Sequence, residues 1–86
     1  MLELSYVGHL REDLQLDSEQ EQLQWRGSLT DVASLIELLC NERGAQWSTA
    51  LQQENLLVSV NRAMVKADHP LADGDEVIFF PPIAGG

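Results

Sequence analysis

The clearest periodic segment of this sequence is a helix candidate near the middle of the chain, between Ser28 and Gly44. Ser28 stands three positions before Asp31, a spacing in which side chains satisfy the free backbone N–H groups of a helix start, and Gly44 suits the left-handed turn that ends a helix. Apolar residues recur between them at the intervals of one helix face: Leu29, Val32, Leu35, Ile36 and Leu39. The rest of the chain has to cover that face.

Short strand-like segments lie on both sides of this helix. Apolar and polar residues alternate, or branched residues cluster, in five places: residues 2–7, 22–25, 56–60, 63–65 and 76–80. Asn61 and Arg62 form a tight turn after the third segment, because Asn tolerates the positive φ of such turns. A weaker helical turn is expected around residues 46–53, where Trp47 and Leu51 form an apolar pair.

The order of these elements predicts an α+β fold. With 86 residues the chain can fill one hydrophobic core, since small chains bury only about 60 to 65% of their surface. Two strands, a helix and three more strands are too compact for a doubly wound sheet, but they suit one mixed sheet wrapped over one main helix, the ubiquitin-like β-grasp. A right-handed crossover then puts the last strand beside the first, inside the sheet. We expect a domain over residues 1–80 and a flexible tail over residues 81–86.

The charge of the chain argues against nucleic acid as a partner. Fourteen acidic and five basic residues give a formal net charge of −9, whereas binding to a phosphate backbone depends on Lys and Arg. An acidic surface favours encounter with a basic patch on a protein. Residues 1–4 carry an acid rather than bases, and no apolar run approaches the roughly 20 residues that span a bilayer. We therefore expect a cytoplasmic protein without membrane contact.

The reactive side chains do not form a recognisable active site. Cys40 is the only cysteine and lies in an apolar run, where a buried structural thiol is expected. His9 and His69 lack the partnered acids and cysteines of a zinc site, and Asp73 and Asp75 suit a solvated turn. We expect no metal site and no stably bound cofactor.

The last six residues carry the clearest chemical meaning. Pro81 and Pro82 end the last predicted strand, because proline has no N–H for the ladder. The segment from Pro81 to Gly86 would project as a tail that reaches about 20 Å when extended. Glycine has no side chain, so Gly85 and Gly86 can enter a narrow channel and present the terminal carboxylate to another protein's active site.

Further motifs accompany this tail: Leu57-Val58-Ser59-Val60-Asn61, Asp68-His69-Pro70-Leu71, Asp73-Gly74-Asp75-Glu76-Val77 and Phe79-Phe80-Pro81-Pro82-Ile83-Ala84-Gly85-Gly86. Together they resemble the small, sulfur-carrying subunits of molybdopterin synthase, and the last motif is the most specific. Leu10-Arg11-Glu12 and residues 47–51 also resemble that family. The acidic segment from Asp13 to Gln22 departs from it, and we expect this segment to affect partner fit rather than chemistry.

The resemblance implies a role for Gly86. A carboxylate is ionised at neutral pH and is a poor electrophile, so it needs activation. In the family, an ATP-dependent activating enzyme adenylates the terminal glycine, and a sulfur donor converts the adenylate into a thiocarboxylate. Ile83, Ala84 and Gly85 would then thread into the large synthase subunit, where sulfur passes to the pterin precursor of the molybdenum cofactor. The chain itself would be a non-catalytic subunit of a heterotetramer, with the catalytic groups on its partners.

A docking surface should accompany the tail. Val77 and Phe79 point to one face of the last strand and Ile78 and Phe80 to the other, and one helix cannot cover both faces. The resemblance implies that the partner interface contains exposed apolar residues and the two prolines: Val7, Met64, Phe80, Pro81 and Pro82.

Three alternatives share the fold. A β-grasp sulfur carrier for another pathway, such as thiamine thiazole synthesis, would use the same tail with a different acceptor. A protein modifier would form isopeptide bonds through Gly86, although Lys66 is the only lysine available for self-linked chains. A pure interaction module would bind partners without any need for a free C-terminus.

Overall fold

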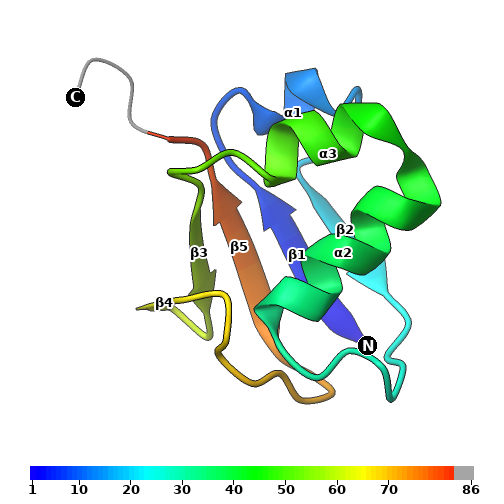
Figure 1. Ribbon diagram of the computed structural model, residues 1–86, viewed down its shortest axis with the longest axis vertical. Coiled ribbons are helices and arrows are strands. Elements are labelled where there is room, and N and C mark those ends of the chain that lie inside the picture. The colour runs from blue at the N-terminus through cyan, green and yellow to red at the C-terminus, as the bar shows by residue number, and fades with distance from the viewer. Residues whose placement is uncertain (83–86) are drawn as a thin grey trace.

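The computed structural model describes residues 1–82, which form one mixed sheet with helices on one of its faces (Figure 1). The sheet has five strands in the order β2-β1-β5-β3-β4. In chain order the elements are β1 (Leu2–Tyr6), α1 (Leu10–Asp13), β2 (Gln20–Leu23), α2 (Val32–Arg43), α3 (Ala45–Leu51), β3 (Leu57–Val60), β4 (Ala63–Val65) and β5 (Glu76–Phe80). All five predicted strands are present.

The last strand of the chain lies at the centre of the sheet. β5 pairs in parallel with β1, where Leu4 lies opposite Val77, and antiparallel with β3, where Ser59 lies opposite Ile78. β2 and β4 are antiparallel edge strands. This arrangement confirms the α+β, ubiquitin-like β-grasp fold and the predicted position of the last strand beside the first.

The core lies between the helices and the inner face of the sheet. Val32, Leu35 and Leu39 form the buried face of α2. They pack with the inward side chains of the two central strands, all of which have no exposed area: Leu2, Leu4, Tyr6, Val77 and Phe79. Burying a side chain of this size contributes about 1.5–3 kcal/mol, so these two strands are the best-anchored part of the sheet.

The predicted start of the main helix is wrong. The N-cap is Asp31, whose carboxylate accepts a hydrogen bond from the Ser34 backbone N–H at 2.8 Å, while the Ser34 hydroxyl accepts one from Asp31 N–H at 3.0 Å. Asp31 is extended and bridges to Pro70, and the carbonyl of Thr30 accepts a bond from Leu71 N–H. This pairing keeps the chain extended past Ser28, so the helix begins four residues later than that residue.

The connection between β1 and β2 also differs from the prediction. It contains the short helix α1, because Leu10 and Leu14 lie four positions apart and both are buried. β2 begins at Gln20 and ends at Leu23, so Trp25 follows the strand, although it still packs partly buried against the core. The first three residues of this edge strand are polar, so the alternation of apolar and polar residues does not indicate where the strand begins.

Several local predictions are confirmed. Gly44 ends α2 with a φ of 96°, and Asn61 and Arg62 turn the chain between β3 and β4 with φ values of 50° and 71°. Trp47 and Cys40 are buried. The division into a domain of residues 1–80 and a tail stays a prediction, because residues 83–86 lie outside the described part of the chain.

Candidate functional site

The predicted carrier residues Ile83, Ala84, Gly85 and Gly86 lie outside the described residues. The site is therefore built from the root of the tail, which the structure does describe. β5 runs parallel to β1, so the C-terminal ends of both strands lie at the same end of the sheet. There Val7 N–H donates to the carbonyl of Phe79 at 3.1 Å, and Phe80 lies opposite Leu57 of β3. The chain is thus held between two strands up to the residue before Pro81 (Figure 1).

A glycine on the neighbouring loop fits against the first proline. Gly8 has a φ of 62°, in the left-handed region, and a Cβ atom at this position would come within 3.0 Å of the Cγ of Pro81. A contact that close forces the neighbouring group to move. Gly8 therefore serves two purposes, because it permits the left-handed turn and it leaves room for Pro81 at the root of the tail.

The outer face of the sheet carries an apolar patch near this root. Val7 of the β1 end, Phe80 and Leu57 lie in adjacent register, and Ile78 and Met64 lie one row further from the tail, on either side of Ser59. Met64 is 58% exposed and Leu57 41% exposed. We call these five residues the docking surface: Val7, Leu57, Met64, Ile78 and Phe80. It contains the three apolar residues that the resemblance implies at the interface, of which Met64 is exposed while Val7 and Phe80 are half-buried.

Two members of the docking surface were not among the predicted site residues. Ile78 was expected on the outer face with Phe80, and it lies there half-buried, while Val77 and Phe79 face the core. Leu57 was read only as part of a strand. Its alternation with the buried Val58 indicates that it points outward. Pro81 and Pro82, also predicted at the interface, are half-buried at the edge of this surface.

One polar group interrupts the docking surface. Ser59 is buried, with 3% of its surface exposed. Its hydroxyl has no hydrogen-bond partner within residues 1–82. An unpartnered buried hydroxyl costs roughly 1–3 kcal/mol. Residues 1–82 therefore supply no bond to this hydroxyl, which lies between Ile78 and Met64 on the outer face.

The outer face is divided by charge. Glu3 and Glu76 lie side by side two rows from the tail root, and with Gln20 and Gln22 they line a shallow polar hollow. Arg62 stands 3.7 Å from Glu76 but is largely exposed, so the pair is weak. The surface is apolar next to the tail and acidic at the opposite end.

A polar network on the helix side of the sheet connects strands β1 and β2 with helix α2. The Tyr6 hydroxyl donates to Glu21 at 2.6 Å, and Arg43 donates to the same carboxylate oxygen at 2.7 Å. The Arg43 guanidinium lies 4.4 Å from the ring centre of Trp47, and the Tyr6 ring contacts both Trp47 and Phe79. Burial, and then the hydrogen bond to Glu21, raise the pKa of Tyr6 well above its usual value.

The other titratable candidates have structural surroundings. The Nδ1 atom of His9 lies 2.6 Å from the carboxylate of Asp13, and both side chains are exposed. Asp75 caps the turn before β5 by accepting bonds from Ala72 N–H and the Asn61 amide. Within residues 1–82 no group of three potential ligands is placed to hold a metal ion, and none of the helices there combines the length and hydropathy that crossing a bilayer requires.

The fold and the tail root define a ubiquitin-like β-grasp protein whose C-terminus leaves from the central strand. The sequence profile of the ThiS family matches residues 4–86, nearly the whole chain, so the protein belongs to the ThiS family. Over 63 residues the chain is 48% identical to a protein of Escherichia coli K12 named molybdopterin synthase sulfur carrier subunit. This match covers 66% of the present chain and 78% of the relative.

Solved structures have the same fold. SAMP1 from Haloferax volcanii superposes with a TM-score of 0.74 at 21% identity, and the match covers 99% of this chain and 98% of SAMP1. A chain from the complex of subunits 1 and 2 of the molybdopterin-converting factor of Helicobacter pylori 26695 has a TM-score of 0.62 at 19% identity, with 99% and 97% covered. At these identities the structures support the fold, while the E. coli relative supports a closer kinship.

Proposed function

We propose that this chain is the sulfur carrier subunit of a molybdopterin synthase and that its working group is the carboxylate of Gly86. The observation that carries the proposal is that the central strand β5 ends at Phe80 beside a partly exposed apolar surface. Pro81, Pro82 and four residues that end in Gly-Gly follow it. The 48% identity to a relative that bears this name supports the same conclusion.

The chemistry follows from the weakness of a carboxylate as an electrophile. An activating enzyme joins the Gly86 carboxylate to the α-phosphate of ATP and releases pyrophosphate. A nucleophilic sulfur species then displaces AMP, so that a C–S bond replaces the C–O bond to phosphate and leaves a thiocarboxylate. ATP is used by the activating enzyme and is not a resident group of the carrier.

The carrier then delivers its sulfur in a complex with a large subunit. The docking surface adheres to that subunit while Ile83, Ala84 and Gly85 thread the tail into its active site, which supplies the catalytic groups and binds the pterin precursor. The complex of subunits 1 and 2 of the H. pylori factor gives a precedent for such a pair. The same surface serves the activating enzyme in turn, in the cytoplasm.

The test is the mass of the intact protein and of its C-terminal peptide after incubation with an activating enzyme, ATP and a sulfur donor. Exchange of oxygen for sulfur at Gly86 should add mass that reacts with a thiol-alkylating reagent and that is absent without ATP. The alkylation is essential, because oxidation of Met64 or Trp25 gives a nearly equal mass.

Two controls make the outcome decisive. A variant with one alanine added after Gly86 should gain no alkylatable mass, because its terminal residue no longer fits the channel for glycine. An unchanged Gly86 carboxylate, with an activating enzyme that is shown to work on another carrier, would reject sulfur transfer. A positive result followed by transfer to a pterin precursor, and not to a thiazole precursor, separates this pathway from that of thiamine.

A further inference from the structure

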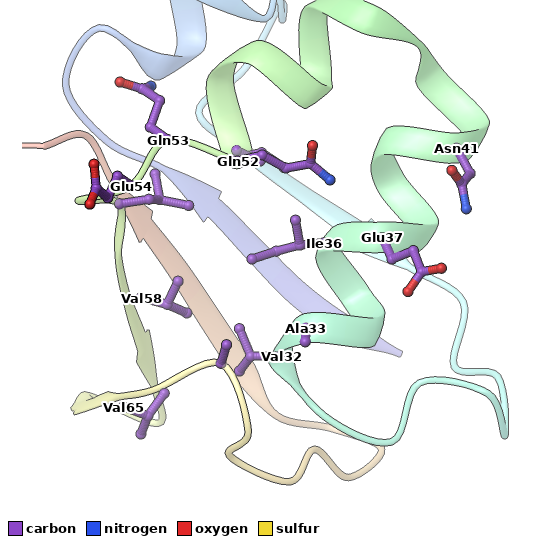
Figure 2. A pocket seen from close by; sticks show the side chains of 13 residues that line it. Val32, Ala33, Ile36, Glu37, Asn41, Gln52, Gln53, Glu54, Val58 and Val65 are labelled. Carbon is purple, nitrogen blue, oxygen red and sulfur yellow. The ribbon is translucent and has the colours of Figure 1, made fainter.

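A groove on the helix side of the sheet has no part in the proposed chemistry. It lies between α2, the connection from α3 to β3, and the β3-β4 end of the sheet, with a volume of about 640 Å³ (Figure 2). Its origin is geometric. A helix with its side chains is about 10–12 Å wide, and strands are spaced about 4.8 Å apart, so α2 alone cannot cover five strands.

The floor of the groove is aliphatic. Eight apolar residues from α2, the end of α3, the sheet and the connections line it: Val32, Ala33, Ile36, Leu51, Leu56, Val58, Val65 and Ala67. Figure 2 shows Ile36 projecting from α2 toward the β3-β4 side, where Val58 and Val65 lie. Ile36, Leu56 and Val65 remain only partly buried. They offer apolar area that a bound side chain would remove from water.

The border of the groove is acidic. Glu37 projects from α2, and Glu54 stands on the α3-β3 connection at the opposite border (Figure 2). Both are exposed, and neither forms an ion pair within residues 1–82. No Lys, Arg or His is among the residues that line the groove. The remaining polar members are uncharged amides, among them Asn41 and Gln53.

We propose that this groove binds a segment of a protein partner in which aliphatic side chains are flanked by Lys or Arg. The volume lies within the range of ordinary binding pockets, about 300–1,000 Å³, and admits one or two such side chains. Two unpaired carboxylates on opposite borders favour basic flanking residues and repel acidic ones. The groove and the docking surface lie on opposite sides of the sheet, so the carrier can hold this partner while its tail is engaged elsewhere.

The probe is an amphipathic helical peptide with leucine on one face and lysine on the other, compared with a twin in which glutamate replaces lysine. Binding is followed through the methyl resonances of the full-length protein. The lysine peptide should give saturable shifts at Ile36, Val58 and Val65, and the glutamate peptide should not. Shifts confined to Met64 and Ile78, or equal binding of both peptides, would overturn the proposal.

Charge variants distinguish specific binding in the groove from attraction to the net negative charge of the protein. Glu37→Lys combined with Glu54→Lys should weaken the lysine peptide about fivefold or more. The matched control is Glu12→Lys combined with Asp17→Lys, two exposed acids outside the groove lining that change the net charge by the same amount. It should have less than a twofold effect. Equal losses in both double variants would mean that the peptide senses only the overall charge.

The binding should persist when the tail is occupied. In the presence of the large subunit, the lysine peptide should retain its affinity for the groove within about twofold, because the two surfaces face opposite directions. Competition between the peptide and the large subunit would contradict two independent sites. Sulfur loading at Gly86 is a separate readout, so a failure of this proposal leaves the proposed function intact and the reverse also holds.

Discussion

The two faces of β5 differ although they belong to the same five residues. On the inner face Val77 and Phe79 have no exposed area, and they meet α2 and the other core residues. On the outer face Ile78 and Phe80 are half-buried, and no helix within residues 1–82 covers them. Because successive side chains of a strand point to opposite faces, the same strand has a buried apolar face and a partly exposed apolar face. The inner face stabilises the protein, whereas the outer face leaves apolar area in contact with solvent.

The largest expected effect is on the inner face. Phe79→Ala should lower the free energy of unfolding by about 3–5 kcal/mol, because it leaves a cavity beside Tyr6. Denaturant unfolding measures the loss. Phe80→Ala is the matched control and should cost less than half as much. Equal losses would mean that the two faces share one core.

A charge on the outer face tests binding. Phe80→Asp should weaken the complexes with the large subunit and with the activating enzyme more than about tenfold, because a central aromatic residue is replaced by a solvated carboxylate. Isothermal calorimetry measures the affinities, and circular dichroism verifies the fold. Either unaltered binding or an unfolded spectrum would refute a docking role that is separate from stability.

The polar network on the helix side of the sheet predicts a loss of stability at high pH. Burial and Glu21 raise the pKa of Tyr6 in the folded protein above the value of 10.0 that it has when exposed. Above about pH 10 the unfolded chain therefore loses a proton that the folded chain keeps, so the free energy of unfolding falls, by up to about 1.4 kcal/mol per pH unit. Below that pH this contribution is complete.

Tyr6 is the only tyrosine, so the change in ultraviolet absorbance on tyrosine ionisation reports this one group. The folded protein should resist ionisation at pH values where the unfolded chain ionises. Tyr6→Phe should remove most of the slope of stability between pH 10 and 12. A slope that persists in this variant would assign the effect to other groups.

The tail root offers a comparison between two glycines with positive φ. Gly8→Ala and Gly74→Ala should each cost roughly 1–2 kcal/mol of stability, because both glycines have positive φ. Only Gly8 has Pro81 beside its missing Cβ, while Gly74 has open space. Gly8→Ala alone should therefore lower kcat/KM for adenylation, by about tenfold. Equal kinetics in the two variants would show that Pro81 does not direct the tail.

The smallest expected effect concerns Ser59. Ser59→Ala removes an unpartnered buried hydroxyl from the outer face and should raise the free energy of unfolding by up to about 1 kcal/mol. Thermal unfolding measures the gain. A loss of stability would show that the hydroxyl has a partner, such as an ordered water molecule.

Local patterns allow part of this structure to be predicted. The alternation in β5 predicts which side chains face inward, and Asn61 and Gly44 predict their turns, because each depends on residues close in the sequence. The N-cap at Asp31 was missed because Ser28 offers a similar local pattern, and the distant Pro70 pairs with Asp31 and keeps the segment after Ser28 extended. α1 was missed because it is only four residues long.

The site divides in the same way. Gly86 and the prolines are recognised from sequence motifs, whereas Leu57 joins the docking surface only through its register with Phe80. The contact between Gly8 and Pro81 and the bond from Tyr6 to Glu21 join segments far apart in the chain. The acidic groove also combines residues of α2 with residues that follow α3. No local pattern encodes such distances.

The central position of β5 also orders events during synthesis. Before residues 76–80 emerge, the β2-β1 hairpin and the β3-β4 hairpin have no strand hydrogen bonds in common, because each pairs with β5 on its inner side. Long-range pairing of this kind is slow, and the chain cannot complete its sheet until residues 76–80 have left the ribosome. A chain without residues 76–80 therefore lacks the strand that joins its two halves into one sheet.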